Sequence, residues 1–365
     1  MANSFGTLFK ITSFGESHSK AVGVVIDGCP PQIEITEDFI QSFLNERRPG
    51  QNHLVSPRNE ADKVTCLSGL EKGITLGTPL CLVVFNKDAR PSDYKIERTY
   101  LRPSHSDYTT LAKYRVKSSS GGGRASARET LARVAAGAVA RKILQQFFPK
   151  LEVLAYVESI HELKIETINP EKLNRKNIYN SLVRCPDPEA SEQMIKLIEK
   201  TKKSGDSLGG VVRCFIKNPP PGLGDPVFDK LDAKLAQAML SIPAVKGFEI
   251  GSGFQAPFMK GSEHNDLFQL KEGKIATKTN RSGGIQAGIS NGQPIDLRVA
   301  FKPTSTIALP QETLDEKGEK FLLELPKGRH DPCVLPRAVP IVEAMAYLTL
   351  TDSFLRQRAQ NNYFS

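Results

Sequence analysis

Apolar residues follow two different spacings along the chain, and the two spacings predict two kinds of element. Between residues 126 and 148 they recur every three to four positions, which is the period of an amphipathic helix. Two shorter runs, Ala21–Asp27 and residues 79–85, are continuously apolar and predict buried strands. Long helices mixed with many strands favour an α+β fold or mixed α/β layers.

Capping residues and further apolar runs extend this prediction over most of the chain. Thr36 has the side chain of a helix N-cap, and Asp225 followed by Pro226 has the sequence of another helix start. Residues 264–280 are polar and aperiodic, which favours a surface loop over a mobile flap above a site. The remaining predicted elements are helices at 36–45, 226–240 and 340–360 and strands at 209–216, 284–290 and 296–303.

Length and composition limit the class of protein. The 365 residues show no repeat, low-complexity tract or obvious linker, which favours a single domain over residues 1–365. The apolar fraction of 39% suffices for a full core, and no run of 18 apolar residues predicts a membrane span. The first ten residues lack the basic and apolar regions of a signal peptide, so we expect a cytoplasmic protein.

Six cysteines are scattered through the sequence without a C-x-x-C pair. This spacing does not suit a zinc site, and the expected cytoplasmic location disfavours disulfides. We therefore expect free cysteines that act as small buried apolar side chains, and no metal ion.

The net charge of +9 indicates an anionic partner, because 49 lysines and arginines outnumber 40 acidic residues. Proteins that bind nucleic acids usually cluster such cations in runs or on one face. Here the basic runs are short, and many arginines stand singly beside Gly, Ser, His and Pro. This distribution favours a pocket for small anions over a surface for nucleic acid.

The strongest local feature is the segment SSSGGGRASARE at 118–129. Its three glycines allow a sharp turn and a close approach to a ligand, and Ser126 with Glu129 has the spacing of a capping box. Arg124 and Arg128 flank the predicted helix start, where free backbone N–H groups attract anions. We expect an anion site here, and the alternative is a flexible loop before a capped helix. The segment fits neither a Walker loop nor a Rossmann fingerprint.

Three of the six histidines lie in polar segments rich in turn residues. His18, in the segment GESH, has a side chain that can protonate a leaving group near neutral pH, although a surface histidine is the stronger interpretation of that segment alone. His105 lies between Pro103 and Asp107, and Asp107 is placed to orient its imidazole. The segment GRHDPC at 328–333 combines a guanidinium, an imidazole and a carboxylate in one loop.

Two further segments add groups that suit anions. KPTST, from Lys302 to Thr306, places successive hydroxyls and a lysine at a strand end, where they would hold a phosphate or a ribityl chain or form a plain polar end. Arg47 adds a cation near the end of a predicted helix. The residues alone therefore predict an enzyme that acts on phosphate-bearing anions.

These segments occur in a specific order and spacing: GESHSKAVGVVIDGCPP, RRPGQ, RPSHSDYTTLAKY, SSSGGGRASARETLARVAAGA, PGLGDPVFDKLDA, SIPAVKGFEIGSGF, KPTST and GRHDPCVLPRAVPIVEAM. The series, from about Phe5 to about Gln360, resembles the chorismate synthase family. The resemblance implies a β-α-β sandwich of antiparallel sheets packed with helices, and a homotetramer.

The resemblance also implies a lyase that converts 5-enolpyruvylshikimate-3-phosphate to chorismate and phosphate, the last common step of the shikimate pathway to the aromatic amino acids. The reaction is a 1,4-anti elimination that requires reduced FMN without a net redox change, and NADPH enters as an indirect reductant.

Five residues match positions with proposed roles in that reaction. The resemblance places His18 near the departing phosphate and His105 where it protonates the reduced flavin near N1. It assigns Asp331, with Ser17 and Ser126, to proton removal assisted by flavin N5.

Further positions match the family's ligand contacts. Those implied for the substrate's phosphate and carboxylates are Ser17, Arg47, Arg102, Arg128 and Arg329. Those implied for FMN are Arg124, Ala125, Ser126, Ala287, Lys302, Pro303, Thr304, Ser305, Thr306 and Arg329. Those implied for NADPH are Arg47 and His53.

Three positions depart from the family pattern. Ser19 stands where Gly or Cys is usual, and Ala125 replaces a serine, so that one hydroxyl contact to flavin is lost. His53 stands where many relatives have an arginine proposed to touch NADPH, which weakens the case for intrinsic flavin reduction. Two alternative functions are a nucleic-acid-binding protein, which needs clustered cations and exposed aromatics, and an FMN oxidoreductase, which consumes NADPH in step with product.

Overall fold

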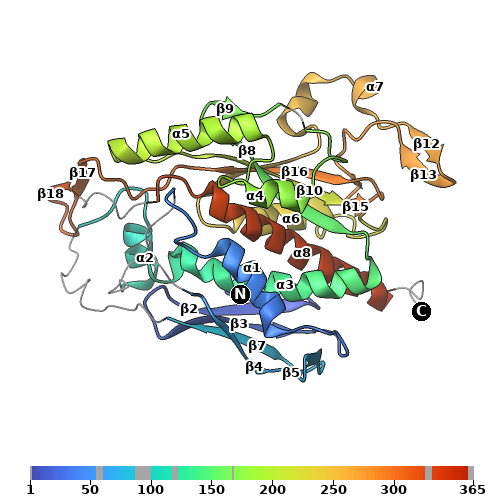
Figure 1. The fold of residues 1–365 in the computed structure, drawn as a ribbon, viewed down its shortest axis with the longest axis horizontal. Coiled ribbons are helices and arrows are strands. Elements are labelled where there is room, and N and C mark those ends of the chain that lie inside the picture. Colours follow the sequence, from blue (N-terminus) through green and yellow to red (C-terminus); the bar gives the residue numbers. More distant parts are fainter. Residues whose placement is uncertain are drawn as a thin grey trace.

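The computed structural model describes residues 2–54, 61–86, 100–116, 122–166, 168–324 and 331–360 of the 365-residue chain. Figure 1 shows a layer of helices between two antiparallel sheets. This arrangement confirms the α+β fold class and the β-α-β sandwich that the sequence predicts.

The first sheet has five antiparallel strands in the order β1-β2-β3-β7-β4. Side chains alternate between its faces, and in β3 Val22, Val24 and Ile26 are fully buried beside the helix α3. The strands are β1 (Ser4–Phe5), β2 (Lys10–Gly15), β3 (Ala21–Asp27), β4 (Val64–Ser68) and β7 (Leu80–Phe85).

The second sheet is also antiparallel, in the order β11-β16-β10-β8-β9. The outer edge of β8 is covered by side chains of α8, because Val153 N donates to Tyr347 Oη and Ala155 N donates to Glu343 Oε1. These contacts satisfy strand donors that would otherwise lack partners. The strands are β8 (Glu152–Ile160), β9 (Leu163–Lys164), β10 (Gly210–Lys217), β11 (Val245–Ile250) and β16 (Ile295–Phe301).

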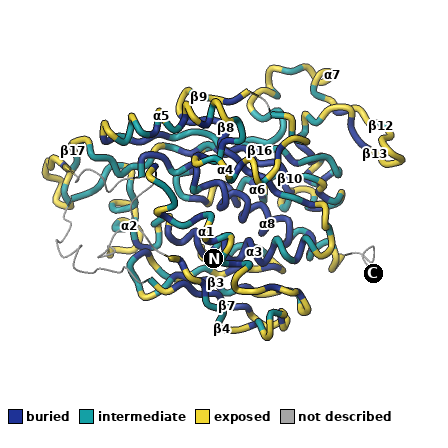
Figure 2. Tube along the Cα trace, viewed as in Figure 1, coloured by how far each residue is buried: buried dark blue, intermediate teal, exposed yellow. Residues whose placement is uncertain are grey.

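The central layer contains α1 (Glu37–Arg47), α3 (Thr130–Phe147), α6 (Leu231–Leu240) and α8 (Leu335–Gln360). Helix α3 packs on β3 and on α8, and α8 packs on β8 and β10, so the two helices bridge the sheets. They approach closely at Gly137, where an added Cβ would lie 2.5 Å from the Cβ of Ala344. Figure 2 shows the buried residues running along α3, α8 and the inner faces of both sheets.

Helix α8 is the most buried helix of this layer. By length and composition it would suffice to cross a membrane, but 89% of its most apolar window lies inside the fold, as in the core helix of a soluble protein. Near its end, Asp352 Oδ1 accepts three backbone N–H groups, from Thr7 at 2.9 Å, Leu8 at 2.7 Å and Phe9 at 3.0 Å. The last helix therefore holds the start of the chain.

The remaining elements lie around this sandwich. Helix α5 shows why they form: Asp187 caps it, Pro188 begins it and Gly205 ends it in the left-handed conformation. The other helices are α2 (Asp107–Tyr114), α4 (Arg175–Asn180), α5 (Pro188–Ser204) and α7 (Gly261–His264). The hairpins are β5 (Leu70–Glu71) with β6 (Ile74–Thr75), β12 (Phe268–Lys271) with β13 (Lys274–Thr277), β14 (Ile285–Gln286) with β15 (Ile289–Ser290), and β17 (Gln311–Leu314) with β18 (Lys320–Leu323).

Several predicted elements are confirmed. Strand β3 has the predicted bounds, β7, β10 and β16 differ by one or two residues, and α1 begins after its N-cap Thr36, whose hydroxyl accepts from Phe39 N at 3.1 Å.

The predicted starts of two helices are wrong. Helix α6 begins at Leu231, because Asp225 does not cap it but pairs with Arg356 at 2.9 Å. Helix α8 begins at Leu335, so Pro340 lies inside it.

Two segments between the main elements also differ from their predictions. Residues 284–290 form the β14–β15 hairpin and not one strand, because Ala287 and Gly288 both have positive φ and turn the chain. The span 264–280 is no plain loop, since it contains the surface hairpin β12–β13.

All six cysteines are free, and Cys66 and Cys81 are only half-buried. Burial raises the pKa of the Cys333 thiol to about 12. Among the described residues there is no group of three or more His, Cys, Asp or Glu side chains that could hold a metal ion.

Candidate active site

A cavity of about 550 Å³ opens where the end of α1 and the starts of α3 and α8 meet two loops, 102–106 and 302–306. Five lining side chains carry a fixed positive charge, and Asp331 is the acidic residue among the lining residues of the described chain. The cationic residues that line it are Arg47, Arg102, Arg128, Lys302 and Arg337. A cavity of this size suits a small molecule, and its charge suits an anion.

One side of the cavity, which we call the helix-side wall, consists of Arg47, Arg128 and Thr130. Arg47 is the last residue of α1 and is only 2% exposed. Its Nε donates to Thr130 Oγ1 at 3.1 Å and its Nη2 donates to the Ala127 carbonyl at 2.5 Å. Burial and the nearby Arg337 charge lower the pKa of Arg47, but a guanidinium remains protonated at neutral pH.

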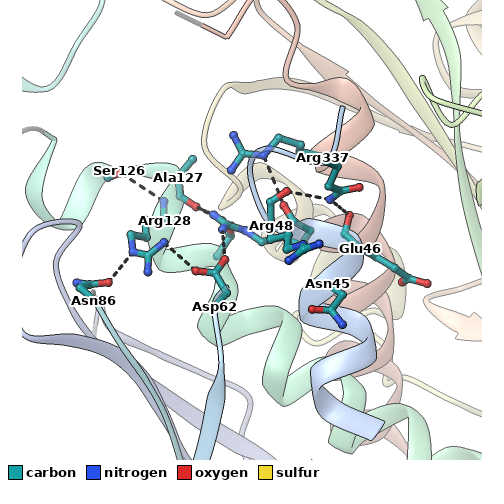
Figure 3. Close-up of polar contacts among 12 residues, drawn as sticks. Asn45, Glu46, Arg48, Asp62, Asn86, Ser126, Ala127, Arg128 and Arg337 are labelled. Carbon is teal, nitrogen blue, oxygen red and sulfur yellow. Dashed lines mark hydrogen bonds and ion pairs between the residues drawn. The ribbon is translucent and has the colours of Figure 1, made fainter. Parts of the chain in front are cut away.

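Arg128 joins the helix-side wall through a buried carboxylate. Asp62, which follows α1 in the chain, contacts Arg128 Nη1 through Oδ1 at 3.0 Å and Arg47 Nη1 through Oδ2 at 3.4 Å. Arg128 Nε also donates to Asn86 Oδ1 at 2.7 Å. Figure 3 shows these contacts converging from three separate segments, so the orientation of Arg128 is fixed by the fold.

The glycine-rich segment before α3 folds differently from the predicted capping box. Two short 3₁₀ turns, Gly123–Ala125 and Ala127–Glu129, precede α3, and the Ser126 hydroxyl accepts from Arg128 N at 3.3 Å. Glu129 does not reach back to Ser126, because its carboxylate pairs with Arg133 one turn along the helix at 2.8 Å. The capping-box prediction is therefore wrong, although Ser126 still caps a turn at the cavity.

A second group of lining residues, which we call the loop-side wall, consists of Arg102, His105, Lys302 and Thr306. His105 Nε2 lies 3.0 Å from Thr306 Oγ1 and its Nδ1 lies 2.9 Å from the Pro103 carbonyl. Lys302 Nζ donates to Ser305 Oγ at 2.6 Å and to the Ser104 carbonyl at 3.3 Å. The two loops thus hold each other, and each contributes polar groups to the cavity.

Asp107 does not orient His105 as the sequence suggested. Its two oxygens instead bind Arg102 Nε at 2.7 Å and Nη2 at 2.6 Å. Although burial opposes it, hydrogen bonding from Arg102 lowers the pKa of Asp107. Burial and the positive charge of Arg102 lower the pKa of His105, which favours a neutral imidazole at neutral pH.

Asp331 lies at the start of the segment that leads into α8. Arg337, on the first turns of that helix, pairs with Asp331 Oδ2 through Nη1 at 2.9 Å. Thr304 Oγ1 donates to the Asp331 carbonyl at 2.7 Å, so the 302–306 loop also supports this position. Among the described lining residues, the cavity therefore has one carboxylate beside several cations.

The structure brings together many of the site residues predicted from the sequence. The lining includes Arg47, Arg102, His105, Ala125, Ser126, Arg128, Lys302, Pro303, Thr304, Ser305, Thr306 and Asp331. Ser17 stands just behind it, since its backbone N contacts the Gly123 carbonyl at 3.4 Å, and its buried hydroxyl has no hydrogen-bond partner among the described residues. His18 follows Ser17 in the same turn.

Other predicted residues lie outside this lining. The guanidinium of Arg124 binds Ser13 and the Gly15 carbonyl of β2, and so ties the glycine-rich segment to the first sheet. Ala287 forms the turn of the β14–β15 hairpin. His53 is on the surface, 62% exposed, and its Nε2 lies 2.9 Å from Glu199 Oε1. Arg329 and His330 fall outside the described residues.

The sequence prediction missed Asp62, Arg337 and the segment Ile242–Pro243–Ala244, which also lines the cavity. Ala244 has a φ of +71°, which is unusual for a residue with a side chain. The quoted segments SIPAVKGFEIGSGF and GRHDPCVLPRAVPIVEAM contain Ala244 and Arg337, but nothing in their pattern marks these positions. Asp62 is an isolated acidic residue that only the tertiary contacts reveal.

Comparisons with known proteins agree on one family. The family model described as chorismate synthase matches residues 9–355. A chorismate synthase from Rippkaea orientalis is 55% identical over 365 residues, covering 100% of both chains. One from Prochlorococcus marinus is 53% identical over 362 residues, covering 99% of this chain and 98% of the relative.

A solved structure agrees with the sequence comparisons. A crystal structure of a chorismate synthase superimposes with a TM-score of 0.77 at 32% identity, covering 97% of this chain and 93% of that chain. Matches of this extent reach every element that builds the cavity, from α1 to the start of α8. The chain belongs to the chorismate synthase family.

Proposed function

We propose that this enzyme is a lyase that converts 5-enolpyruvylshikimate-3-phosphate to chorismate and phosphate by a 1,4-anti elimination, the last common step of the shikimate pathway. The electron pair of a ring C–H bond forms a new double bond, the existing double bond shifts, and the C–O electron pair leaves with phosphate. Family membership supports the reaction, and the cationic cavity supports the class of substrate.

The observation that carries this proposal is the charge of the cavity. The substrate has two carboxylates and a phosphate, and a cavity with five fixed cations offsets that negative charge. Desolvating several anions together without such partners would cost far too much free energy. Polar groups of both walls line the cavity, and their contacts with the ligand would fix its orientation.

Different residues of the site would have different roles in the reaction. We assign Arg47, Arg102, Arg128 and Arg329 to the substrate's anionic groups and His18, beside the buried Ser17, to the charge that develops on the departing phosphate. Asp331 is the acidic lining residue of the described chain, so we assign its carboxylate, with Ser17 and Ser126 nearby, to removal of the ring proton. Arg337 would hold Asp331 in place.

Reduced FMN is the cofactor we infer, and the lining fits it. Its phosphate and ribityl hydroxyls would meet Lys302 and the hydroxyls of Thr304, Ser305 and Thr306, and the segment around Ala125 and Ser126 would supply backbone contacts. When bound, reduced FMN supplies an electron-rich ring that assists the elimination without net oxidation. We assign His105, which lines the same cavity, to proton donation to the reduced flavin ring.

We further infer a cytoplasmic homotetramer that binds no nucleic acid and no membrane. For NADPH, the buried Arg47 and the Glu199-bound His53 are poorly placed to bind a nucleotide phosphate together. NADPH therefore acts, on this proposal, as an indirect reductant.

The decisive experiment is anaerobic incubation of the purified enzyme with 5-enolpyruvylshikimate-3-phosphate and dithionite-reduced FMN, following the absorbance of chorismate. We expect many turnovers for each equivalent of reductant. Product formed only in step with oxidised reductant would indicate an FMN oxidoreductase, and no product would reject the lyase.

A further inference from the structure

We propose that Asp62 is a positioning residue that holds the guanidinium groups of Arg47 and Arg128 in one arrangement at the helix-side wall. The proposal rests on the proposed function, because it assumes that these two arginines face the substrate's anionic groups. Asp62 does not line the cavity. On this proposal it affects turnover through its two arginine partners.

The first observation is the sharing of one carboxylate between two cations. The side chain of Asp62 is 0% exposed, and its two oxygens take different partners, Arg128 at 3.0 Å and Arg47 at 3.4 Å. Two guanidiniums that lie this close repel each other unless an anion stands between them. The trio keeps one net positive charge, which is available to an anion in the cavity.

The second observation is that further contacts within the fold hold the two arginines. Arg47 is held by Thr130 and Ala127, and Arg128 is held by Asn86. These partners come from the start of α3 and from the end of β7, so the trio joins the helix layer to the first sheet. A guanidinium fixed in this way needs no reorganisation when the ligand arrives.

The third observation is that Asp62 is itself held in place. Gln41, on α1, donates from Nε2 to the Asp62 carbonyl at 3.3 Å and accepts from Val64 N at 2.9 Å. Asp62 has a φ of +43°, a left-handed conformation that aspartate tolerates better than most residues. Gln41 therefore holds the backbone at Asp62 and just after it, as expected for a residue that positions others.

The test compares Asp62→Asn with Asp296→Asn. Asparagine keeps the shape of the side chain, but its amide is neutral and has a single acceptor oxygen. It therefore cannot accept hydrogen bonds from both arginines as the carboxylate does. Asp296 is the matched control, because it is a largely buried aspartate that binds a single arginine, Arg213, away from the cavity. Binding of inorganic phosphate is measured by titration calorimetry, and kcat and KM are measured with saturating reduced FMN.

We expect Asp62→Asn to lower kcat by about ten-fold to a hundred-fold, the scale of a misplaced binding group. We also expect at least three-fold weaker binding of inorganic phosphate, although the variant is locally more positive. The control should keep both values near wild type even if its melting temperature falls. Unchanged or tighter phosphate binding with an unchanged kcat would overturn the proposal, since Asp62 would then only offset charge.

Two further measurements keep the test decisive. If Asp62→Asn does not fold, Gln41→Ala provides a second variant, because it removes the support of Asp62 without leaving a buried charge unpaired. We expect a smaller loss in kcat and in phosphate affinity. Unchanged values would overturn the proposal. If the wild-type enzyme forms no chorismate, the proposed function fails, and the phosphate titrations still decide the role of Asp62.

Discussion

The two walls of the cavity are built in different ways. The guanidiniums of the helix-side wall are buried, and each has partners from several segments of the fold. The groups of the loop-side wall are half-buried, and the loops 102–106 and 302–306 hold them mainly by binding each other. The first wall is therefore set when the core packs, whereas the second can adjust by local movement of two loops.

This difference predicts an unequal sensitivity to substitution. A cation fixed by the core acts as a preorganised electrostatic partner, and its loss cannot be repaired by its neighbours. A cation on a loop shares its task with Lys302, His105 and several hydroxyls. The predictions below separate the two walls, beginning with the largest expected effect.

Arg128→Ala should lower kcat/KM by about 10²–10³, the scale for loss of a preorganised donor. Arg102→Ala, on the loop-side wall, should cost only about ten-fold, because loop groups remain to share its task. Steady-state kinetics with saturating reduced FMN measure both. Arg133→Ala is the control, since Arg133 lies on the same helix but binds Glu129 and Ser241. Equal losses for Arg128 and Arg102 would remove the distinction between the walls.

His18→Ala and Asp331→Ala should each lower turnover by about ten-fold or more, as expected when an acid or base group is lost. Neither residue belongs to the two walls, so their effect should appear in kcat more than in KM. Wild-type rates in both variants would reject the assigned roles.

The loop-side wall should also show a pH signature. Because burial and Arg102 lower the pKa of His105, NMR titration of the free enzyme should give a value below the ordinary one of about 6.5. The unfolded chain then binds the proton more readily than the folded protein does. The contribution of His105 to stability is therefore present above the ordinary pKa of about 6.5, and it is lost as the pH falls through the lower pKa of the folded state. His105→Gln should flatten this part of the unfolding curve. A normal or raised pKa would contradict the described environment.

Arg124→Ala should give the smallest effect, a few-fold loss of FMN affinity measured by fluorescence titration. Arg124 reaches the cavity only indirectly, because it ties the glycine-rich segment to β2. FMN affinity equal to that of the wild type would mean that this tie does not shape the ligand site.

Much of the fold was accessible from the sequence because its signals are local. The apolar runs of β3 and β7 and the Thr36 cap of α1 depend on neighbouring residues alone, and these elements are confirmed. The start of α6 was misplaced because a tertiary ion pair between Asp225 and Arg356 competes with the local cap. Strand β8 and helix α5 were not predicted at all.

The site residues likewise fall into those that a local motif identifies and those that only tertiary contacts reveal. Motifs identified residues that carry chemistry, including His105, Arg128 and Asp331, and the fold brings these to one cavity. The sequence could not show that Asp107 binds Arg102 in place of His105, because both residues lie near Asp107 in the chain. It also could not find Asp62, whose importance comes from partners 15 and 66 positions away.

The hydrogen bonds from the backbone of Thr7, Leu8 and Phe9 to the Asp352 carboxylate have a consequence for biosynthesis. Thr7 leaves the ribosome 345 residues before Asp352, whose carboxylate secures it. Helix α8 also packs on β8 and β10, so the second sheet lacks this covering helix until α8 has emerged. The nascent chain must therefore keep the apolar side chains of β8 and β10 without this cover until α8 is made, and exposed strands of this kind favour aggregation.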